Sequence, residues 1–126
     1  KTYIAVVSGH MEPEEAVIDM PIERNPKAPA TFRVGSNGKT AQTHYKVTKS
    51  DEKHDILELK PVTGRTHQLR VHLKQVGHPI VGDLLYNGEE ADRLYLHAFS
   101  LEITMPSGER RTFTAPVPAE FKDMNL

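Results

Sequence analysis

The sequence of 126 residues contains no cysteine. This absence excludes disulfide bonds, thiolate zinc sites and thiol catalysis, and it favours a cytoplasmic protein over a small disulfide-stapled secreted domain. The sequence also lacks any apolar run near the roughly 18 residues that a membrane-spanning helix requires. Its first residues, Lys1 to Ala5, do not have the layout of a signal peptide. We therefore expect a cytoplasmic domain without a membrane segment.

The sequence has no excess of positive charge, since its formal net charge is −1. Many free-standing RNA-binding domains are clearly basic, so RNA binding here requires that the basic residues be clustered. They are clustered between residues 60 and 74, where no acidic residue occurs and four cations stand: Lys60, Arg65, Arg70 and Lys74. A locally basic strip on a nearly neutral chain can still meet a phosphate backbone.

Alternating apolar and polar residues predict an antiparallel hairpin in the middle of the chain. In residues 41–49, Thr43, Tyr45 and Val47 fall on one face of an expected strand. A polar turn follows, and residues 56–60 continue with a second alternating strand. Further strands are expected at residues 3–7, 17–20, 31–34, 94–104 and 111–115, with an irregular crossing at 23–30 and a short helix at 119–124.

The spacing of apolar residues changes after residue 65 and predicts one principal helix over residues 66–76. Leu69, Leu73 and Val76 recur at intervals of four and three, which places them on one helical face. We expect Thr63 or Thr66 to cap the start of this helix and Gly77 to end it. The fold class is therefore α+β, with a mainly antiparallel sheet and one principal helix in a single unit, residues 1–126.

The densest group of polar residues runs from Lys60 to His72, where a strand ends, a Thr-Gly turn follows and the helix begins. Free N–H groups at the start of a helix attract anions, and Arg65 adds a positive charge beside them. His67, Arg70 and Lys74 follow at spacings that place them on one face. Taken alone, this pattern is more typical of a strand-to-helix connection with solvated charges.

The string Thr63-Gly64-Arg65-Thr66-His67-Gln68-Leu69-Arg70-Val71-His72 resembles the signature near the C-terminus of RluA-type RNA pseudouridine synthases. Other blocks of that family follow in order and at similar distances. They are Lys1-x-Tyr3-x-Ala5, Gly38-Lys39 with Tyr45, Gly77-His78-Pro79-Ile80 with Gly82-Asp83 and Tyr86, Leu96-His97-Ala98, and Ala115-Pro116 with Phe121. The resemblance thus spans nearly the whole chain.

The resemblance implies an isomerase that converts uridine to pseudouridine in ribosomal or transfer RNA, without a metal or an organic cofactor. The essential aspartate of the family lies in a His-Arg-Leu-Asp segment upstream of the Lys-x-Tyr strand, and the 126 residues do not include that segment. We therefore expect this chain to be the C-terminal portion of the catalytic domain, inactive on its own.

The resemblance also implies roles for individual residues. Tyr3 matches the tyrosine that packs against the target base, and an aromatic face suits a base taken out of its stack. Arg70 matches the basic residue that pairs with the catalytic aspartate, and without that aspartate we expect Arg70 to lack a partner. Arg65 and His67 are candidates for contact with RNA phosphates or for support of the site.

Lys60 and Lys74 are weaker candidates for contact with the RNA backbone, and solvation explains both equally well. The aspartate of Gly82-Asp83 is expected to cap a turn rather than to take part in catalysis. Tyr3 and Arg70 also have interpretations without any function, Tyr3 as a core tyrosine and Arg70 as an exposed helix arginine.

Three rival functions remain open at this point. A histidine metal site is disfavoured because His67 and His72 are five residues apart, which puts them on different helix faces. A hydrolase would need more than Ser100 near His97. A non-catalytic RNA-binding domain of the same fold is the main alternative. If a strand is missing at the edge of the sheet, we also expect self-association through that edge.

Overall fold

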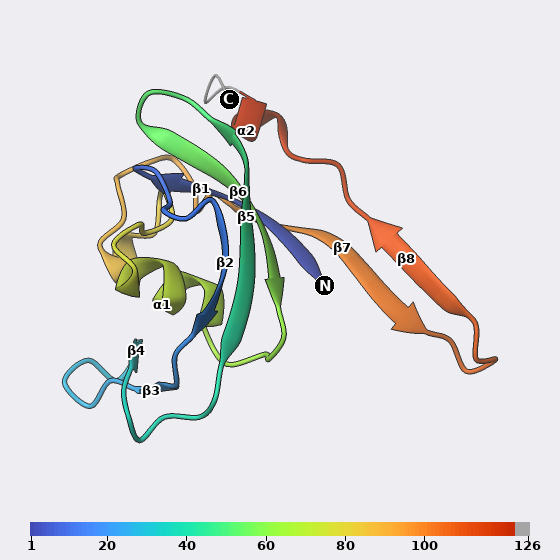
Figure 1. Ribbon diagram of the computed structural model, residues 1–126, viewed down its shortest axis with the longest axis horizontal. Helices are drawn as coiled ribbons and strands as arrows, with labels where there is room; N and C mark the ends of the chain where they lie inside the picture. Colours follow the sequence, from blue (N-terminus) through green and yellow to red (C-terminus); the bar gives the residue numbers. More distant parts are fainter. Residues whose placement is uncertain (123–126) are drawn as a thin grey trace.

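The computed structural model describes residues 1–122, and it is an α+β fold as predicted (Figure 1). The strands are β1 (Thr2–Ser8), β2 (Glu15–Asp19), β3 (Ile22–Arg24), β4 (Phe32–Val34), β5 (Gln42–Ser50), β6 (His54–Pro61), β7 (Leu96–Thr104) and β8 (Arg110–Thr114). The helices are α1 (Gln68–Gln75), the 3-10 helix η1 (Leu84–Tyr86) and α2 (Ala119–Lys122). None of the helices within residues 1–122 is long and apolar enough to cross a membrane.

The main sheet has the strand order β2-β5-β6-β1-β7-β8, and every neighbouring pair is antiparallel. The predicted hairpin is confirmed as β5 and β6, in which Tyr45 lies opposite Leu59 and Val47 opposite Leu57. The alternation is confirmed as well, because Leu57 and Leu59 are fully buried whereas Lys60 is exposed. The hairpin therefore presents one apolar face to the core.

Helix α1 packs against the buried face of the β5–β6 hairpin (Figure 1). Leu69 and Leu73 enter the main core, as the predicted apolar stripe requires. Val71, on another face of the helix, enters a second, smaller core together with Ile22 and Tyr86. The helix is thus buried on two sides, and only a narrow strip of it remains at the surface.

The sequence-based expectation for residues 23–30 was partly wrong. Ile22–Arg24 forms the short strand β3, which pairs with β4 as a separate two-stranded ribbon. The ribbon packs on α1, where Ile22 is buried and Phe32 is partly buried. Three residues are too few to show an alternation in the sequence, so the strand is visible only from its pairing with β4.

The start of α1 also differs from the expectation. The N-cap residue is His67, which has a left-handed backbone conformation (φ 54°) and makes no capping hydrogen bond with its side chain. Neither Thr63 nor Thr66 caps the helix. The predicted end is confirmed, because Gly77 has φ 88° and its N–H donates to the carbonyl of Lys74.

Asp55 lies near the start of β6 and binds the segment that follows β1. Its buried carboxylate accepts hydrogen bonds from Ser50 Oγ (2.6 Å), His10 Nδ1 (2.8 Å) and the N–H of Met11 (2.8 Å). Burial by itself raises the pKa of Asp55, but the hydrogen bonds from His10, Ser50 and Met11 outweigh it and the pKa is lowered. The carboxylate is therefore ionised in the folded protein at neutral pH.

We predict that Asp55→Asn lowers the free energy of unfolding by about 2 kcal/mol at pH 7, because hydrogen bonds to a buried charge are lost. The folded pKa lies below the unfolded value of about 3.9, so this stabilisation is complete above about pH 4 and is lost as the pH falls through the folded pKa. Urea unfolding at pH 7 and below pH 4 measures both effects. Equal urea midpoints for Asp55→Asn and the unaltered chain at pH 7 would contradict the prediction.

Candidate active site

A series of buried and partly buried hydrogen bonds fixes the segment between β6 and α1. The Oε1 atom of Gln68 accepts from Thr63 Oγ1 (2.7 Å) and from the N–H of Arg65 (3.0 Å). Its Nε2 atom donates to the carbonyl of Gln42 (2.8 Å) and to Thr43 Oγ1 (3.0 Å). One amide side chain therefore joins the turn, the start of the helix and strand β5.

His72 extends this series of hydrogen bonds to the other side of the helix. Its side chain is fully buried, with Nδ1 at 2.8 Å from Thr43 Oγ1 and Nε2 at 2.8 Å from the carbonyl of Met20. Since a carbonyl only accepts, Nε2 carries the proton and Nδ1 accepts from the threonine. Burial lowers the pKa of His72, which keeps the ring neutral. Sequence analysis assigned no role to His72 or Gln68, and both prove to be parts of the scaffold.

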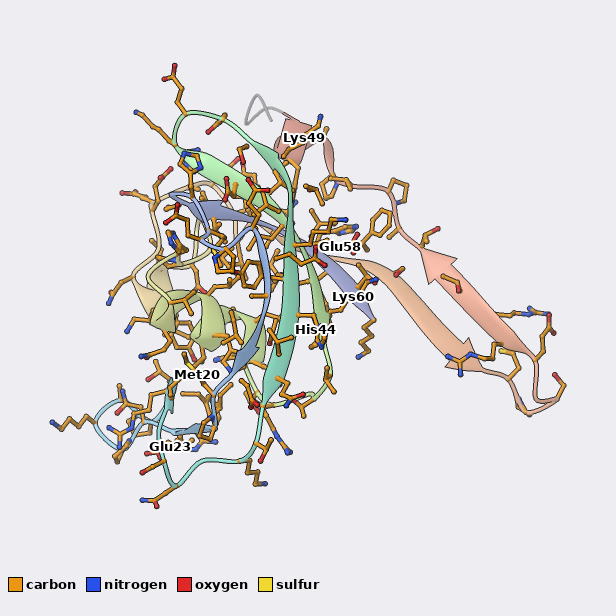
Figure 2. All side chains as sticks on the ribbon, viewed as in Figure 1. Met20, Glu23, His44, Lys49, Glu58 and Lys60 are labelled. Atoms are coloured by element: carbon orange, nitrogen blue, oxygen red, sulfur yellow. The ribbon has the colours of Figure 1, made fainter. Side chains whose placement is uncertain are left out.

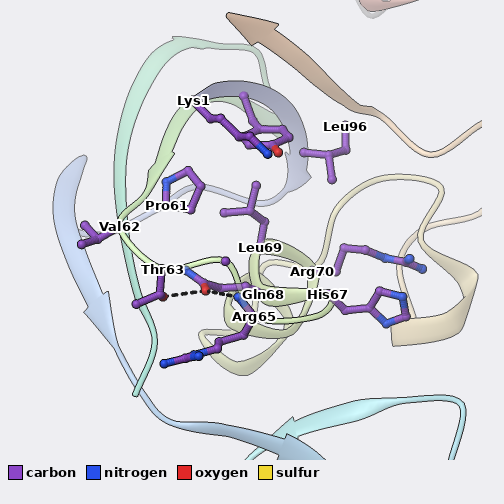
Figure 3. A pocket seen from close by; sticks show the side chains of 12 residues that line it. Lys1, Pro61, Val62, Thr63, Arg65, His67, Gln68, Leu69, Arg70 and Leu96 are labelled. Atoms are coloured by element: carbon purple, nitrogen blue, oxygen red, sulfur yellow. Dashed lines mark hydrogen bonds between the residues drawn. The ribbon is translucent and has the colours of Figure 1, made fainter. Parts of the chain in front are cut away.

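Above this scaffold lies an open pocket of about 520 Å³ (Figure 3). Its wall is built from the start of β1, the β6–α1 connection, the first turn of α1 and the start of β7. The lining residues are Lys1, Tyr3, Pro61, Val62, Thr63, Gly64, Arg65, His67, Gln68, Leu69, Arg70 and Leu96. Four of the six predicted site residues meet here, namely Tyr3, Arg65, His67 and Arg70.

Arg70 has a partner in this structure, contrary to the expectation from the sequence. Its Nε and Nη2 atoms donate to the two carboxylate oxygens of Asp83 at 2.9 and 2.8 Å. The guanidinium also lies over the ring of Tyr86, with 5.2 Å from Cζ to the ring centroid. Within residues 1–122 its Nη1 atom has no hydrogen-bond partner, so both N–H groups of Nη1 remain for a further acceptor.

Asp83 was expected to cap a turn, and this expectation was wrong. Its side chain makes no capping hydrogen bond at η1 and is fully buried against Arg70. Its backbone supports the turn instead, because the N–H of Gly88 donates to its carbonyl. Arg70 and Asp83 are thirteen residues apart, a distance at which no periodicity in the sequence reveals a pair.

His67 is the residue immediately before α1, and its side chain contacts the ring of Tyr86. Its Nδ1 atom is 2.7 Å from the hydroxyl of Tyr86, and its ring meets Tyr86 and Phe32 edge to face. Burial and the nearby charge of Arg70 lower the pKa of His67, whereas Asp83 acts in the opposite direction with less effect. The imidazole is therefore neutral at physiological pH.

Arg65 lies at the other side of the pocket, on the turn that precedes the helix (Figure 3). Its Nε atom donates to the carbonyl of Thr40 at 2.8 Å, which holds the side chain against the β5 side of the turn. Within the described part of the chain, its terminal Nη atoms have no partner. Arg65 also lines a second hollow of about 380 Å³ beside the ribbon, together with Arg24 and Lys39. Within residues 1–122 no carboxylate pairs with Arg65.

Tyr3 lies near the start of β1, opposite Leu59 of β6 and Ala98 of β7. Its side chain is partly buried against the main core and lines the pocket. It also borders a neighbouring hollow of about 330 Å³ between β1 and the β7–β8 hairpin. The hydroxyl makes no hydrogen bond within residues 1–122, so Tyr3 presents an aromatic surface rather than a tethered polar group.

Lys60 and Lys74 do not line the pocket. Lys60 is 62% exposed and lies on the outer face of the sheet, where Figure 2 shows it near His44 and Glu58. Its Nζ atom is 3.5 Å from the carboxylate of Glu58, an exposed pair of little energetic weight. Lys74 is exposed on α1.

The rival chemistries find no support in the geometry. Within residues 1–122 no group of three histidine or carboxylate side chains comes together as a metal site would require. The Nε2 atom of His97 is 3.1 Å from the carbonyl of Ala115, and within residues 1–122 no hydrogen bond joins His97 to Ser100.

Comparison with known proteins identifies the family. The family model described as RNA pseudouridylate synthase matches residues 1–75. The dual-specificity RNA pseudouridine synthase RluA of Escherichia coli is 44% identical over 124 residues, covering 92% of this chain and 56% of that protein. An uncharacterized RNA pseudouridine synthase of Chloroflexus aurantiacus is 41% identical over 127 residues, covering 97% of this chain and 40% of that protein.

The fold agrees with this relationship. The solved structure of human RNA pseudouridylate synthase domain containing 1 superposes with a TM-score of 0.82 at 36% identity, covering 92% of this chain and 54% of that one. The chain belongs to the RNA pseudouridylate synthase family. It spans about half the length of the curated relatives that it matches.

We predict that Asp83→Asn lowers the free energy of unfolding by about 3 kcal/mol, because it leaves the largely buried Arg70 without its charge partner. The double variant Arg70→Met/Asp83→Leu should lose less free energy of unfolding than Asp83→Asn alone, since it leaves no buried charge. Urea unfolding of the three proteins measures these differences.

The exposed pair of Glu23 and Arg33 provides the matched control, and Glu23→Gln should cost less than about 1 kcal/mol. If Asp83→Asn costs no more than Glu23→Gln, the assigned role of the Arg70–Asp83 pair is wrong.

Proposed function

We propose that the protein to which this chain belongs is an RNA pseudouridine synthase that isomerises uridine in ribosomal or transfer RNA. The observation that carries the proposal is the pocket in which an aromatic ring, Tyr3, and a fixed guanidinium, Arg70, face the same space. The family membership supports the reaction type. The names of relatives support the RNA class, including a ribosomal large subunit pseudouridine synthase D of Nitrosomonas europaea, which is 39% identical.

In this proposal each pocket residue has one task. Tyr3 packs against the target base after it leaves its stack, since its ring is not tethered by a hydrogen bond at the hydroxyl. The free Nη1 side of Arg70 receives the carboxylate of the catalytic aspartate and orients it, as a charge-assisted hydrogen bond does. Arg65 contacts an RNA phosphate, because its charge is uncompensated.

The catalytic aspartate itself lies outside these 126 residues in our proposal, so the chain is the C-terminal portion of the catalytic domain. None of the six aspartates of the chain follows a His-Arg-Leu sequence (Asp19, Asp51, Asp55, Asp83, Asp92 and Asp123). The one that reaches Arg70, Asp83, is fully buried behind it and does not line the pocket. The isolated 126-residue chain is therefore proposed to be inactive.

A non-catalytic RNA-binding domain is the second candidate. It retains Arg65 and the aromatic surface of Tyr3, and it differs from the synthase only in the absence of chemistry. Lys60 and Lys74 fit contact with the RNA backbone outside the pocket in either case. A cytoplasmic location is proposed for both, because the chain has no cysteine and both functions act on RNA.

The test is the release of tritium from RNA labelled at C5 of uridine. Pseudouridine joins the base to the ribose through C5, so its formation displaces the tritium at that carbon. The full-length protein is incubated with RNA from a strain of the source organism that lacks the gene. We expect turnover by the unaltered protein and a loss of at least about 100-fold with Arg70→Lys, since lysine cannot bind Asp83 and a second carboxylate in the same geometry.

Lys53→Ala, far from the pocket, is the control and should keep full activity. Binding of the RNA without any release of tritium would overturn the synthase proposal and favour the non-catalytic alternative. Release of tritium by the isolated 126-residue chain would overturn the assignment of the catalytic aspartate to the rest of the protein.

We further propose that the isolated chain self-associates through the edges of its sheet, β2 and β8. Unpaired backbone groups on an edge strand can pair with another chain. The chain should then show a mean mass that rises with concentration in sedimentation equilibrium. Val17→Pro should abolish this rise if β2 takes part, since proline removes an N–H and resists strand pairing. A constant monomer mass at all concentrations would contradict the proposal.

A further inference from the structure

The hydroxyl of Tyr86 fixes the protonation pattern of His67. The backbone N–H of Phe32 donates to this hydroxyl at 3.0 Å, and the hydroxyl lies 2.7 Å from His67 Nδ1. Within residues 1–122 the hydroxyl has no other hydrogen-bond partner, so its own proton finds an acceptor only if Nδ1 of His67 is unprotonated. A neutral imidazole that accepts at Nδ1 carries its proton on Nε2.

The orientation of the ring is fixed as firmly as its tautomer. Phe32 and Tyr86 meet the imidazole edge to face, with centroid distances of 5.7 and 5.6 Å. The backbone of His67 is left-handed, which is uncommon for a residue other than glycine and is concentrated at functional sites. Within residues 1–122 the Nε2 atom has no hydrogen-bond partner, and His67 lines the pocket. An oriented donor is therefore available to a ligand.

The charged and titratable groups around His67 keep the ring uncharged. Arg70 lies on the same helix, and Tyr86 and Asp83 belong to the η1 segment that packs against it. Burial and the charge of Arg70 together lower the pKa of His67, and the charge of Asp83 opposes them with less effect. His67 thus differs from the phosphate-binding cation that its position in a basic segment suggests.

We propose that His67 is a specificity residue, whose neutral imidazole donates Nε2–H to a carbonyl oxygen of the base in the pocket. The proposal rests on the proposed function, because it takes the ligand to be a nucleotide of RNA. A carbonyl oxygen is the suitable acceptor because a single neutral donor does not compensate a phosphate charge, whereas Arg65 on the same pocket can. Uracil offers two such oxygens, and Tyr3 offers the surface on which the base rests.

Nuclear magnetic resonance of the 126-residue chain labelled with ¹⁵N-histidine tests the tautomer without any RNA. Two-bond couplings distinguish a protonated nitrogen from an unprotonated one. We expect His67 with the proton on Nε2 at pH 7, and a mixed tautomer in Tyr86→Phe. A charged ring at pH 7, or a proton on Nδ1, would overturn the proposal whatever the enzyme does.

Binding measurements on the full-length protein test the contact with the base. The probe is a stem-loop RNA that the protein modifies, made with uridine or with 4-thiouridine or 2-thiouridine at the target, because sulfur accepts hydrogen bonds more weakly than oxygen. One of the two thio-substitutions should weaken binding to the unaltered protein about 5-fold. His67→Asn, which tolerates the left-handed backbone but does not reach the Nε2 position, should weaken binding to the uridine RNA by a similar factor.

The losses of affinity caused by the sulfur substitution and by His67→Asn should not add, because both remove the same hydrogen bond. The His67→Asn variant should therefore bind the thio-substituted and uridine RNAs equally. His67→Gln, which places an amide N–H near the Nε2 position, is the matched variant and should retain part of the sensitivity to sulfur. The slope of affinity against salt should be the same for His67→Asn and the unaltered protein. A smaller slope, or tighter binding of the unaltered protein below pH 6, would show a phosphate contact and overturn the proposal.

The proposed function and this inference fail in different ways. If the full-length protein modifies no RNA, the proposed synthase is wrong, and the tautomer measured by magnetic resonance is unaffected. If it modifies RNA and His67→Asn responds to the thio-substitutions as the unaltered protein does, the synthase stands and the contact of His67 with the base is wrong.

Discussion

The side chain of Gln68 is the constraint on which the pocket depends. Its four hydrogen bonds, to Thr63, the N–H of Arg65, the carbonyl of Gln42 and Thr43, tie the turn after β6 to the start of α1 and to β5. All of these groups are shielded from water to some degree, so removal of the amide would leave several unpaired polar groups at once. The turn can therefore hold Arg65 and His67 at the pocket without a helix cap of its own.

The polar residues of the segment from Thr63 to His72 divide into two groups by direction. Thr63, Gln68 and His72 face inward and form a continuous series of hydrogen bonds that ends at the carbonyl of Met20. Arg65, His67 and Arg70 face the pocket. The turn before α1 and the helix itself carry both groups, and the eight-residue helix is buried on two sides, against the hairpin and against the ribbon.

Periodicity was sufficient to predict the hairpin and the helix, since Leu57, Leu59, Leu69 and Leu73 lie where alternation and the helical repeat place them. The resemblance to a family was needed to single out Tyr3 and Arg70, whose residue types alone suit a core and a surface. The pairing of Arg70 with Asp83 was missed because it depends on a turn that brings together residues with no shared element. The same reason hid the hydrogen bond between Tyr86 and His67. The strand β3 was missed because three residues are too few to show an alternation.

The charges of the pocket differ in whether a partner within the chain compensates them. Asp83 neutralises Arg70 at close range, so the field of Arg70 falls off quickly and this side of the pocket suits a neutral base beside the uncharged His67. Arg65 has only a carbonyl as partner, so its side attracts an anion. A nucleotide has this same polarity, with a neutral base at one end and a phosphate at the other. Under the proposed function, this distribution of charge predicts that a nucleotide lies with its base toward His67 and Arg70 and its backbone toward Arg65.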